Sequence, residues 1–173
     1  MALTRGLRPL LTLLPLAGCT ARQAYFNTLG DDLEAVASSE LDAATTSVQV
    51  AMYAFDSDGL KNALMNAVDR GIPVQLCVDS GQLADQHAMP GVVADLREHG
   101  VTVGETYGQG PGAYAAMHNK FAVIDENVVL TGSYNWTDNA RDDNDENLLV
   151  LHDPAIAAAY AEDFTALWER CSE

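Results

Sequence analysis

Residues 47–79 alternate between two kinds of hydrophobic pattern, and this alternation restricts the folds open to the chain. Ser47–Phe55 and Ile72–Asp79 are short apolar runs typical of buried strands. The segment between them predicts a helix that is capped by a polar residue at 56–58 and ends at Gly71. Its apolar residues recur at helical spacing: Leu60, Ala63, Leu64, Ala67 and Val68. Two strands joined by such a helix predict a right-handed βαβ unit.

The rest of the chain extends this pattern to one α/β domain. Composition agrees, because 173 residues with 48% hydrophobic and 20% charged content suit a single globular domain, and no internal repeat is visible. We expect a mixed β-sheet flanked by helices, the domain covering residues 29–173. The further expected elements are helices near 29–44, over Pro90–His99 and from Asp153-Pro154 onward, an edge strand Val101–Glu105, and strands Ala116–Asp125, Val128–Gly132 and Asn147–Leu151.

The first residues have the composition of a secretory signal. Arg5 and Arg8 precede a short apolar run, Leu10–Leu16, which is too short to span a bilayer. We therefore predict a signal peptide over residues 1–18. The mature protein is then expected in the bacterial cell envelope or periplasm, or outside the cell.

The end of this segment, Leu16-Ala17-Gly18-Cys19, resembles a bacterial lipobox. The resemblance implies that Cys19 is lipidated and becomes the mature N-terminus, followed by a tether over residues 19–28. A membrane would then be a partner of the protein through the lipid on Cys19. The alternative is an ordinary secretory signal in which Cys19 has no such role.

Two further cysteines are compatible with more than one state. Cys77 lies in an apolar strand and is interpreted as a small buried hydrophobic residue. A disulfide between Cys77 and Cys171 is possible outside the cytoplasm, but the sequence does not establish it. No spacing of cysteine or histidine residues suggests zinc.

Residues 118–135 hold the side chains that a phosphate-binding nucleophilic site needs. His118 and Lys120 lie two apart in a predicted strand, so we expect them to project from one face. Ser133 and Asn135 follow the next strand and also lie two apart, so we expect them to point to the same side. They come after Gly132, which lets the backbone approach closely. A histidine for covalent chemistry, a fixed cation and two neutral hydrogen-bonding side chains suit a phosphoryl group.

The spacing of these residues resembles the HKD signature of the phospholipase D superfamily, above all its small single-motif Nuc-type endonucleases and phospholipase D-like proteins. Six positions match: His118, Lys120, Asp125, Gly132, Ser133 and Asn135. Glu146 falls where that family has an acidic partner for the histidine. The likeness extends over about residues 24–170, through VQVAMYAF and the C-terminal helix with Phe164 and Trp168.

The resemblance implies a phosphodiester hydrolase with a phosphohistidine intermediate. His118 would attack phosphorus while His118 of a second copy protonates the leaving oxygen, so a chain with one motif should form a homodimer. Lys120 and Asn135 would hold the non-bridging oxygens, Ser133 would add a hydrogen bond, and Glu146 would orient an imidazole. No metal or other cofactor is implied.

Several neighbouring residues have simpler interpretations. Asp125 is expected to be structural, because it has the opposite parity to His118 and ends the strand. The GQGPG segment, which lies in an expected loop over Thr106–Met117, is interpreted as a mobile lip over the site, and Asp138–Glu146 as a solvated turn apart from Glu146. Trp136 is equally compatible with lining the pocket and with packing. Three histidines are expected to be structural: His87, His99 and His152.

The net charge of the chain helps to choose between the possible substrates. The chain carries 9 basic and 25 acidic residues, a formal charge of −16. Loss of Arg5 and Arg8 leaves 7 basic residues against 25 acidic ones, or −18. Nucleic-acid affinity depends on Lys and Arg contacts to phosphates, and here these residues form no cluster in the sequence. We favour a phospholipid substrate, with an envelope or secreted nuclease cleaving DNA or RNA as the alternative. A non-catalytic binding lipoprotein is a third hypothesis, against which the intact motif argues.

Overall fold

The computed structural model describes residues 21–85, 89–112 and 114–171. The expected signal peptide, Cys19 and His87 lie outside the described residues.

Within the described residues, seven strands form one mixed sheet in the order β1-β7-β6-β5-β2-β3-β4. Strands β2, β3 and β4 pair in parallel, and all the other neighbours pair antiparallel. The parallel β2–β3 pair confirms the expected βαβ unit, and the mixed sheet confirms the predicted fold class. The strands are β1 (Ala21–Phe26), β2 (Val48–Met52), β3 (Val74–Asp79), β4 (Thr102–Thr106), β5 (Lys120–Ile124), β6 (Val128–Gly132) and β7 (Asn147–His152).

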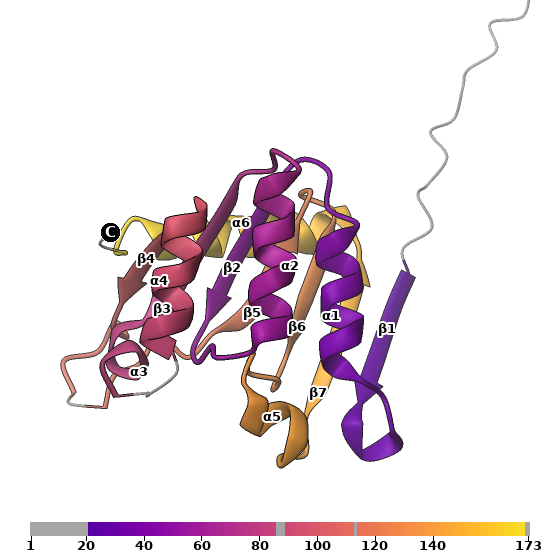
Figure 1. Cartoon of the computed structure of the whole chain (residues 1–173), viewed down its shortest axis with the longest axis horizontal. Coiled ribbons are helices and arrows are strands. Elements are labelled where there is room, and N and C mark those ends of the chain that lie inside the picture. The colour runs from indigo at the N-terminus through magenta and orange to yellow at the C-terminus, as the bar shows by residue number, and fades with distance from the viewer. Residues whose placement is uncertain (1–20, 86–88, 113, 172–173) are drawn as a thin grey trace, which may run out of the picture.

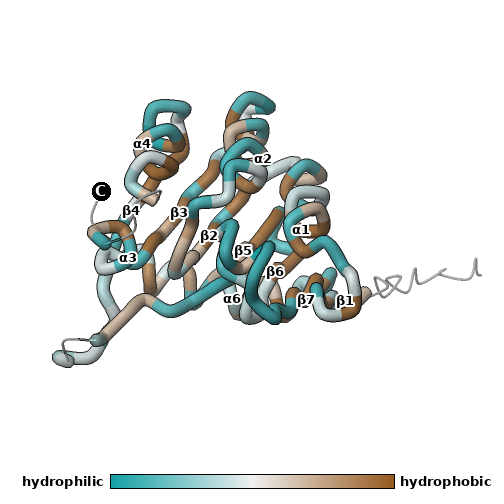
Figure 2. The backbone as a smooth tube through the Cα atoms, turned by 60° about the horizontal axis from the view of Figure 1, so that its bottom comes forward, coloured by the Kyte–Doolittle hydropathy of each residue, from teal (hydrophilic) through white to brown (hydrophobic). Residues whose placement is uncertain are grey.

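Helices cover both faces of this sheet. Three lie side by side on one face: α1 (Leu33–Asp42), α2 (Asp58–Asp69) and α4 (Met89–His99), and α6 (Pro154–Trp168) crosses the other face (Figures 1 and 2). The short elements η1 (Asn27–Leu29), α3 (Ser80–Asp85) and α5 (Asp138–Asp142) lie toward the same end of the strands, at the bottom of the view (Figure 1). Because both faces are covered, most residues of the central strands are apolar and buried.

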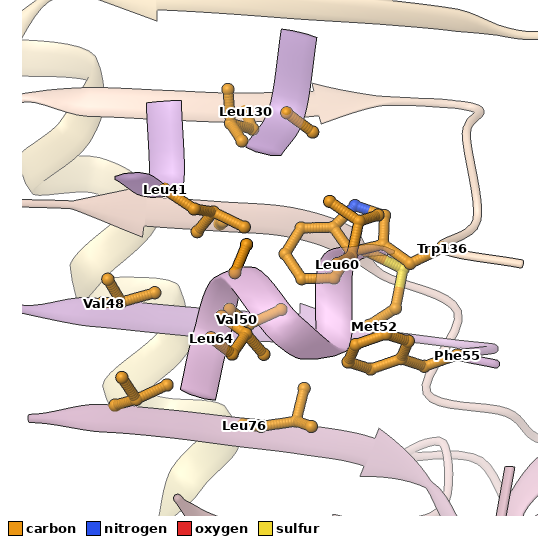
Figure 3. Close-up of a cluster of buried hydrophobic side chains, with 14 of the residues drawn as sticks. Leu41, Val48, Val50, Met52, Phe55, Leu60, Leu64, Leu76, Leu130 and Trp136 are labelled. Atoms are coloured by element: carbon orange, nitrogen blue, oxygen red, sulfur yellow. The ribbon is translucent and has the colours of Figure 1, made fainter. Parts of the chain in front are cut away.

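Each face of the sheet has its own hydrophobic core. The larger core joins α1, α2 and α4 to the sheet, with Leu60 and Leu64 of α2 packed over the strands (Figure 3). The smaller core lies beneath α6, where Phe164 and Leu167 meet Phe121 and other residues of the strands. Trp136 is 2% exposed and belongs to the larger core, where its ring meets that of Phe55 at 5.4 Å. Its role is therefore packing.

The predicted helix boundaries follow from capping. Ser57 caps α2 by accepting a hydrogen bond from the Leu60 amide at 3.1 Å, and Gly71 follows the helix with φ of +82°. Only glycine adopts this left-handed conformation without a steric cost. Asp153 caps α6 in the same way by accepting bonds from the Ala155 and Ile156 amides. Local capping thus confirms where these two predicted helices begin.

Three expectations about secondary structure need correction. The expected tether 19–28 contains strand β1, which pairs with β7 at the edge of the sheet. The expected solvated turn at 138–146 contains the helix α5, capped by Thr137. The strand expected from Ala116 begins at Lys120, so His118 lies in the loop just before β5.

The structure also joins Cys77 and Cys171 in a disulfide. Cys77 lies in β3 and Cys171 follows α6, so the bond attaches the end of α6 to the strand next to the edge strand β4. Cys77 is fully buried, as expected, but it is a disulfide partner and not a free thiol.

Candidate active site

The motif residues meet at one end of the central strands. Lys120 begins β5 beside Met52, the last residue of β2, and Gly132 ends β6 beside Leu148 near the start of β7. His118 immediately precedes β5, and Ser133 immediately follows β6. Residues far apart in the sequence therefore come together because antiparallel pairing aligns the start of one strand with the end of the next.

His118 and Lys120 are adjacent, as predicted. Nζ of Lys120 lies 3.4 Å from each ring nitrogen of His118 and donates a hydrogen bond to the His118 carbonyl oxygen at 3.1 Å. The imidazole is exposed, whereas the lysine is half-buried. His118 can therefore be reached from solvent while Lys120 is fixed behind it.

Tyr53 supports both of these side chains. Its ring centroid lies 4.4 Å from that of His118 and 4.9 Å from Nζ of Lys120, the second contact being a cation–π interaction. The Tyr53 amide also donates a hydrogen bond to the Asn119 carbonyl at 2.9 Å. Tyr53 was not identified as a site residue from sequence, because nothing local indicates that the end of β2 lies beside β5.

The ionisation of this pair is shifted toward neutral forms. Burial and the nearby Lys120 charge lower the pKa of His118, and the carboxylate of Asp79 acts in the opposite direction. Burial also lowers the pKa of Lys120, against the effect of the Glu146 carboxylate. A lowered pKa favours the neutral imidazole, which is the form that can act as a nucleophile.

Ser133 and Glu146 form the second part of the site. The Ser133 hydroxyl donates a short hydrogen bond to Glu146, and Oγ accepts bonds from the backbone and side-chain nitrogens of Asn147 at 3.0 and 3.1 Å. Glu146 is 8% exposed and also accepts a bond from the Asn144 amide group. Among the described residues, the hydrogen bonds of Glu146 do not reach His118, so its predicted role toward an imidazole stays a prediction.

Gly132 and Asn135 complete the motif at this position. A Cβ atom at Gly132 would collide with the Asn147 carbonyl, so the close approach of β6 and β7 requires glycine there. Asn135 is partly buried, and its side-chain oxygen has no hydrogen-bond partner among the described residues. Its predicted contact with a phosphoryl group would come from the amide NH2, which can donate a hydrogen bond, and stays a prediction.

Asp125 has the structural role that was expected. Its carboxylate accepts hydrogen bonds from the amides of Thr45, Thr46 and Ser47 and from both threonine hydroxyls, at the end of β5 remote from His118. Burial acts to raise the pKa of Asp125, but these hydrogen bonds outweigh it and hold the pKa far below its usual value. Asp125 therefore attaches the loop after α1 to the sheet.

Asp79 is a second residue that sequence reasoning missed. It ends β3, is 2% exposed, and accepts hydrogen bonds from the Met117 and Gln82 amides at 2.7 and 2.9 Å. A usable signal was present, because side chains at the carboxyl ends of parallel strands commonly form α/β sites.

A cavity of about 290 Å³ opens beside His118. Its lining includes Tyr53, whose ring contacts that of His118, Asp79, and residues of the segment after β4. Tyr114 on that segment is 98% exposed, and Tyr107 is 60% exposed. Tyr107 and Tyr114, on either side of GQGPG, line the cavity, and the role of GQGPG as a mobile lip stays a prediction. The lining residues are Tyr53, Asp79, Gly81, Gln82, Asp85, Tyr107, Tyr114, Ala115 and Ala116.

The other histidines that the structure describes lie away from this site. His99 pairs with Asp69 at 2.9 Å, and His152 lies 3.5 Å from Glu40. In residues 21–85, 89–112 and 114–171, no group of three or more His, Cys, Asp or Glu side chains could hold a metal ion. No helix in these ranges has the length and apolarity needed to cross a membrane.

Comparison with known proteins identifies relatives that are similar in sequence and solved structures that are similar in fold. The family model described as "Cardiolipin synthase, PLD-like domain" matches residues 38–168. The mitochondrial cardiolipin hydrolase of Xenopus laevis is 38% identical over 131 residues, covering 75% of this chain and 58% of the relative. The human protein of the same name is 34% identical over 128 residues, covering 74% of this chain and 48% of the relative. The chain thus spans about half the length of the curated relatives it matches.

Solved structures resemble the whole described fold. Nuc from Salmonella typhimurium, a phospholipase D family member, superposes with a TM-score of 0.80 and 25% identity, covering 88% of this chain and 97% of Nuc. NucT from Helicobacter pylori gives a TM-score of 0.79 at 25% identity, covering 88% and 98%. Together with the match over residues 38–168, these likenesses show that the chain belongs to the phospholipase D superfamily.

Proposed function

We propose that this chain is a phospholipase D-type phosphodiesterase that acts through a phosphohistidine, with phospholipid as its substrate. One observation carries the proposal: an exposed imidazole with a fixed ammonium group 3.4 Å from its ring nitrogens. The hydrogen-bonding groups of Ser133 and Asn135 lie at the same end of the strands. This set suits a phosphoryl group better than any ligand that lacks negative charge.

The chemistry proceeds in two displacements. A ring nitrogen of His118 forms a bond to phosphorus as the bond to the leaving alcohol oxygen breaks, and a second histidine protonates that oxygen. The same second histidine then removes a proton from water, whose oxygen attacks phosphorus and breaks the P–N bond. Lys120 and Asn135 stabilise the non-bridging oxygens throughout.

The second histidine is proposed to come from another copy of the chain. His118 is the one histidine at the site among the described residues, whereas the mechanism needs two. A homodimer with twofold symmetry would bring two copies of this exposed site together. Glu146 of one copy is then proposed to orient the imidazole of the other.

The distribution of positive charge favours phospholipid over nucleic acid. Apart from Lys120, several basic side chains are paired with acidic residues: Arg22 with Asp153, Lys61 with Asp58 and Asp95, and Arg141 with Glu34, Asp138 and Asp142. A nucleic-acid groove needs several unpaired cations along a backbone. The names of the relatives, cardiolipin hydrolase and, in Rickettsia felis, phospholipase D, agree with a lipid substrate.

A nuclease is the second candidate, and the fold comparison favours it. Nuc and NucT share nearly their full lengths with this chain. Against it stands the formal charge of −16.

We further propose that the protein works outside the cytoplasm as a lipoprotein anchored through Cys19. The signal-like N-terminus supports export, and the Cys77–Cys171 disulfide supports an oxidising compartment. Cell fractionation of the wild type and Cys19→Ser tests the anchor: the variant should leave the membrane fraction. Retention of the variant there would contradict lipidation at Cys19.

One set of assays tests the catalytic proposal. Purified protein is given bis(4-nitrophenyl) phosphate, phosphatidylcholine vesicles with and without cardiolipin, and single-stranded DNA, each with and without EDTA. We expect hydrolysis of the soluble diester and of lipid, retained in EDTA and abolished in His118→Ala. His99→Ala is the matched control and should keep full activity. Activity on DNA alone would replace the phospholipid proposal with the nuclease, and inactivity on every substrate would favour a binding protein.

A further inference from the structure

We propose that Asp79 is a positioning residue for His118, holding the backbone before the imidazole and placing a negative charge beside it. This inference rests on the proposed function, in which His118 is the nucleophile. It adds a residue that lies outside the H-x-K and G-S motif and 39 positions before His118 in the sequence.

The carboxylate of Asp79 joins two segments. One oxygen accepts a hydrogen bond from the Met117 amide at 2.7 Å, so it fixes the residue directly before His118. The other oxygen accepts a bond from the Gln82 amide at 2.9 Å, in the first turn of α3. Because Asp79 itself belongs to β3, the sheet determines the position of the loop that carries the imidazole.

The negative charge on Asp79 has no basic partner of its own. At 2% exposure the carboxylate is shielded from water, and in the described part of the chain it forms no ion pair with lysine or arginine. A buried carboxylate is costly unless hydrogen bonds or a nearby positive charge compensate it. The two amide bonds supply part of this compensation, and a protonated His118 supplies more.

The other groups around His118 do not have the effect that Asp79 has on the charge of the imidazole. Lys120, from β5, is the nearest cation and together with burial lowers the pKa of the imidazole, whereas Asp79 raises it. Tyr53 contacts the ring, with 4.4 Å between the two ring centroids. Asp85, Tyr107 and Tyr114 line the adjoining cavity. Asp79 is therefore the acidic group that opposes Lys120 at this imidazole.

The opposite effects of Lys120 and Asp79 on the pKa of His118 matter because the imidazole changes charge during the reaction. The ring becomes cationic when it takes up a proton or forms the P–N bond, and a nearby carboxylate stabilises the cation. Lys120 disfavours the cationic imidazole, and the Asp79 carboxylate offsets part of this effect.

Replacing Asp79 with Asn tests the inference. The amide keeps the shape of the side chain but removes its charge, so the pKa of His118 should fall further in an NMR titration. In the proposed dimer one imidazole must be neutral and the other protonated, so both limbs of the pH profile of kcat/KM should shift to lower pH. At neutral pH we expect kcat on bis(4-nitrophenyl) phosphate to fall about tenfold or more with little change in KM.

Asp153→Asn is the matched control. Asp153 is also a buried carboxylate that caps a helix, but it follows β7 at the opposite end of the sheet from His118. This variant should lose stability and leave the His118 titration and the pH profile unchanged. If Asp79→Asn does not fold, Asp79→Ser keeps an oxygen that can cap α3 and serves the same comparison.

The outcomes separate the two proposals. An active wild type whose Asp79 variants keep the pH profile and the His118 pKa would refute the role of Asp79 alone. If the wild type hydrolyses no phosphodiester, the proposed function fails, and the NMR titration still decides whether Asp79 controls the charge of His118.

Discussion

Lys120 determines how the imidazole next to it behaves. Its Nζ lies 3.4 Å from both ring nitrogens of His118, and Tyr53 holds it there through a cation–π contact. A fixed cation can stabilise phosphoryl oxygens, and at the same time it disfavours protonation of the nearby histidine. One side chain therefore serves both charge stabilisation and nucleophile activation.

Lys120→Gln should reveal both effects. Loss of the ammonium group should lower kcat/KM about 100- to 1,000-fold, because a donor to the developing charge is removed. The pKa of His118 should rise, since the Lys120 charge lowers it in the wild type. Steady-state kinetics and an NMR titration of His118 measure the two effects.

Lys61→Gln, which changes a lysine paired with Asp58 and Asp95, is the control. An unchanged His118 titration would contradict the electrostatic coupling.

Asp125 should contribute to folding and not to chemistry. Its carboxylate is held ionised by hydrogen bonds from Thr45, Thr46 and Ser47, so its pKa is lower in the folded than in the unfolded chain. Such a group stabilises the fold above the unfolded pKa of about 4, and the contribution is lost as pH falls through the folded pKa. Asp125→Asn should lower the free energy of unfolding at pH 7 by about 1–3 kcal/mol.

Urea denaturation between pH 7 and pH 3 measures this contribution. The wild type should lose stability with acidification more steeply than Asp125→Asn, because the variant lacks this titrating group. Activity per folded molecule should be unchanged at pH 7. Equal pH dependence in the two proteins would show that Asp125 titrates normally.

At the scale of elements, the sequence predicted most strands and helices because each carries a periodic pattern. Helix α2 shows one apolar face, and β5 and β6 flank a short turn at 125–127. Strand β1 escaped prediction because it pairs with one neighbour only and its side chains are mostly exposed, so it has no buried face to produce a pattern. Helix α5 has five residues, too few for a helical period to be visible.

The residues of the candidate site also fall into two groups, those that local sequence patterns predicted and those that they did not. His118, Lys120, Ser133 and Asn135 could be predicted because their spacing along two adjacent strands is local information. Tyr53 could not be assigned, because its position depends on the long-range pairing of β5 with β2. Asp79 was missed although its place at the carboxyl end of a predicted parallel strand was a usable signal. The partner of Glu146 was also beyond local reasoning, since its bond to Ser133 depends on the register of β6 and β7.

The disulfide gives α6 a covalent attachment in addition to its apolar face. Helix α6 covers one face of the sheet by itself, and Cys171 after its end is bonded to Cys77 in β3. A bond that closes a loop of 94 residues restricts the unfolded chain strongly. Cys171→Ser should therefore lower the free energy of unfolding by about 2–4 kcal/mol.

Thermal unfolding with and without a reducing agent measures this effect. Reduction should lower the Tm of the wild type to that of Cys171→Ser and leave the variant unchanged. A wild type that is insensitive to reductant, with free thiols by chemical labelling, would show that the bond is absent in solution.

At the scale of the molecule, one chain supplies one of the two histidines that the proposed reaction needs. Each chain offers one exposed imidazole, and a twofold dimer would supply the second. Activity of mixed dimers then depends on how many chains carry the histidine. Wild-type and His118→Ala chains, unfolded together in equal amounts and refolded, should give dimers in statistical proportions.

If both imidazoles are needed, only dimers of two wild-type chains are active. The mixture should then have about one quarter of the activity of the same total amount of wild-type protein, since random pairing gives that fraction of wild-type dimers. Independent sites would instead give about one half, the fraction of wild-type chains. Sedimentation equilibrium of each sample establishes that dimers are present, and His99→Ala in place of His118→Ala should give full activity. One half of the activity, or an active monomer, would refute the shared site.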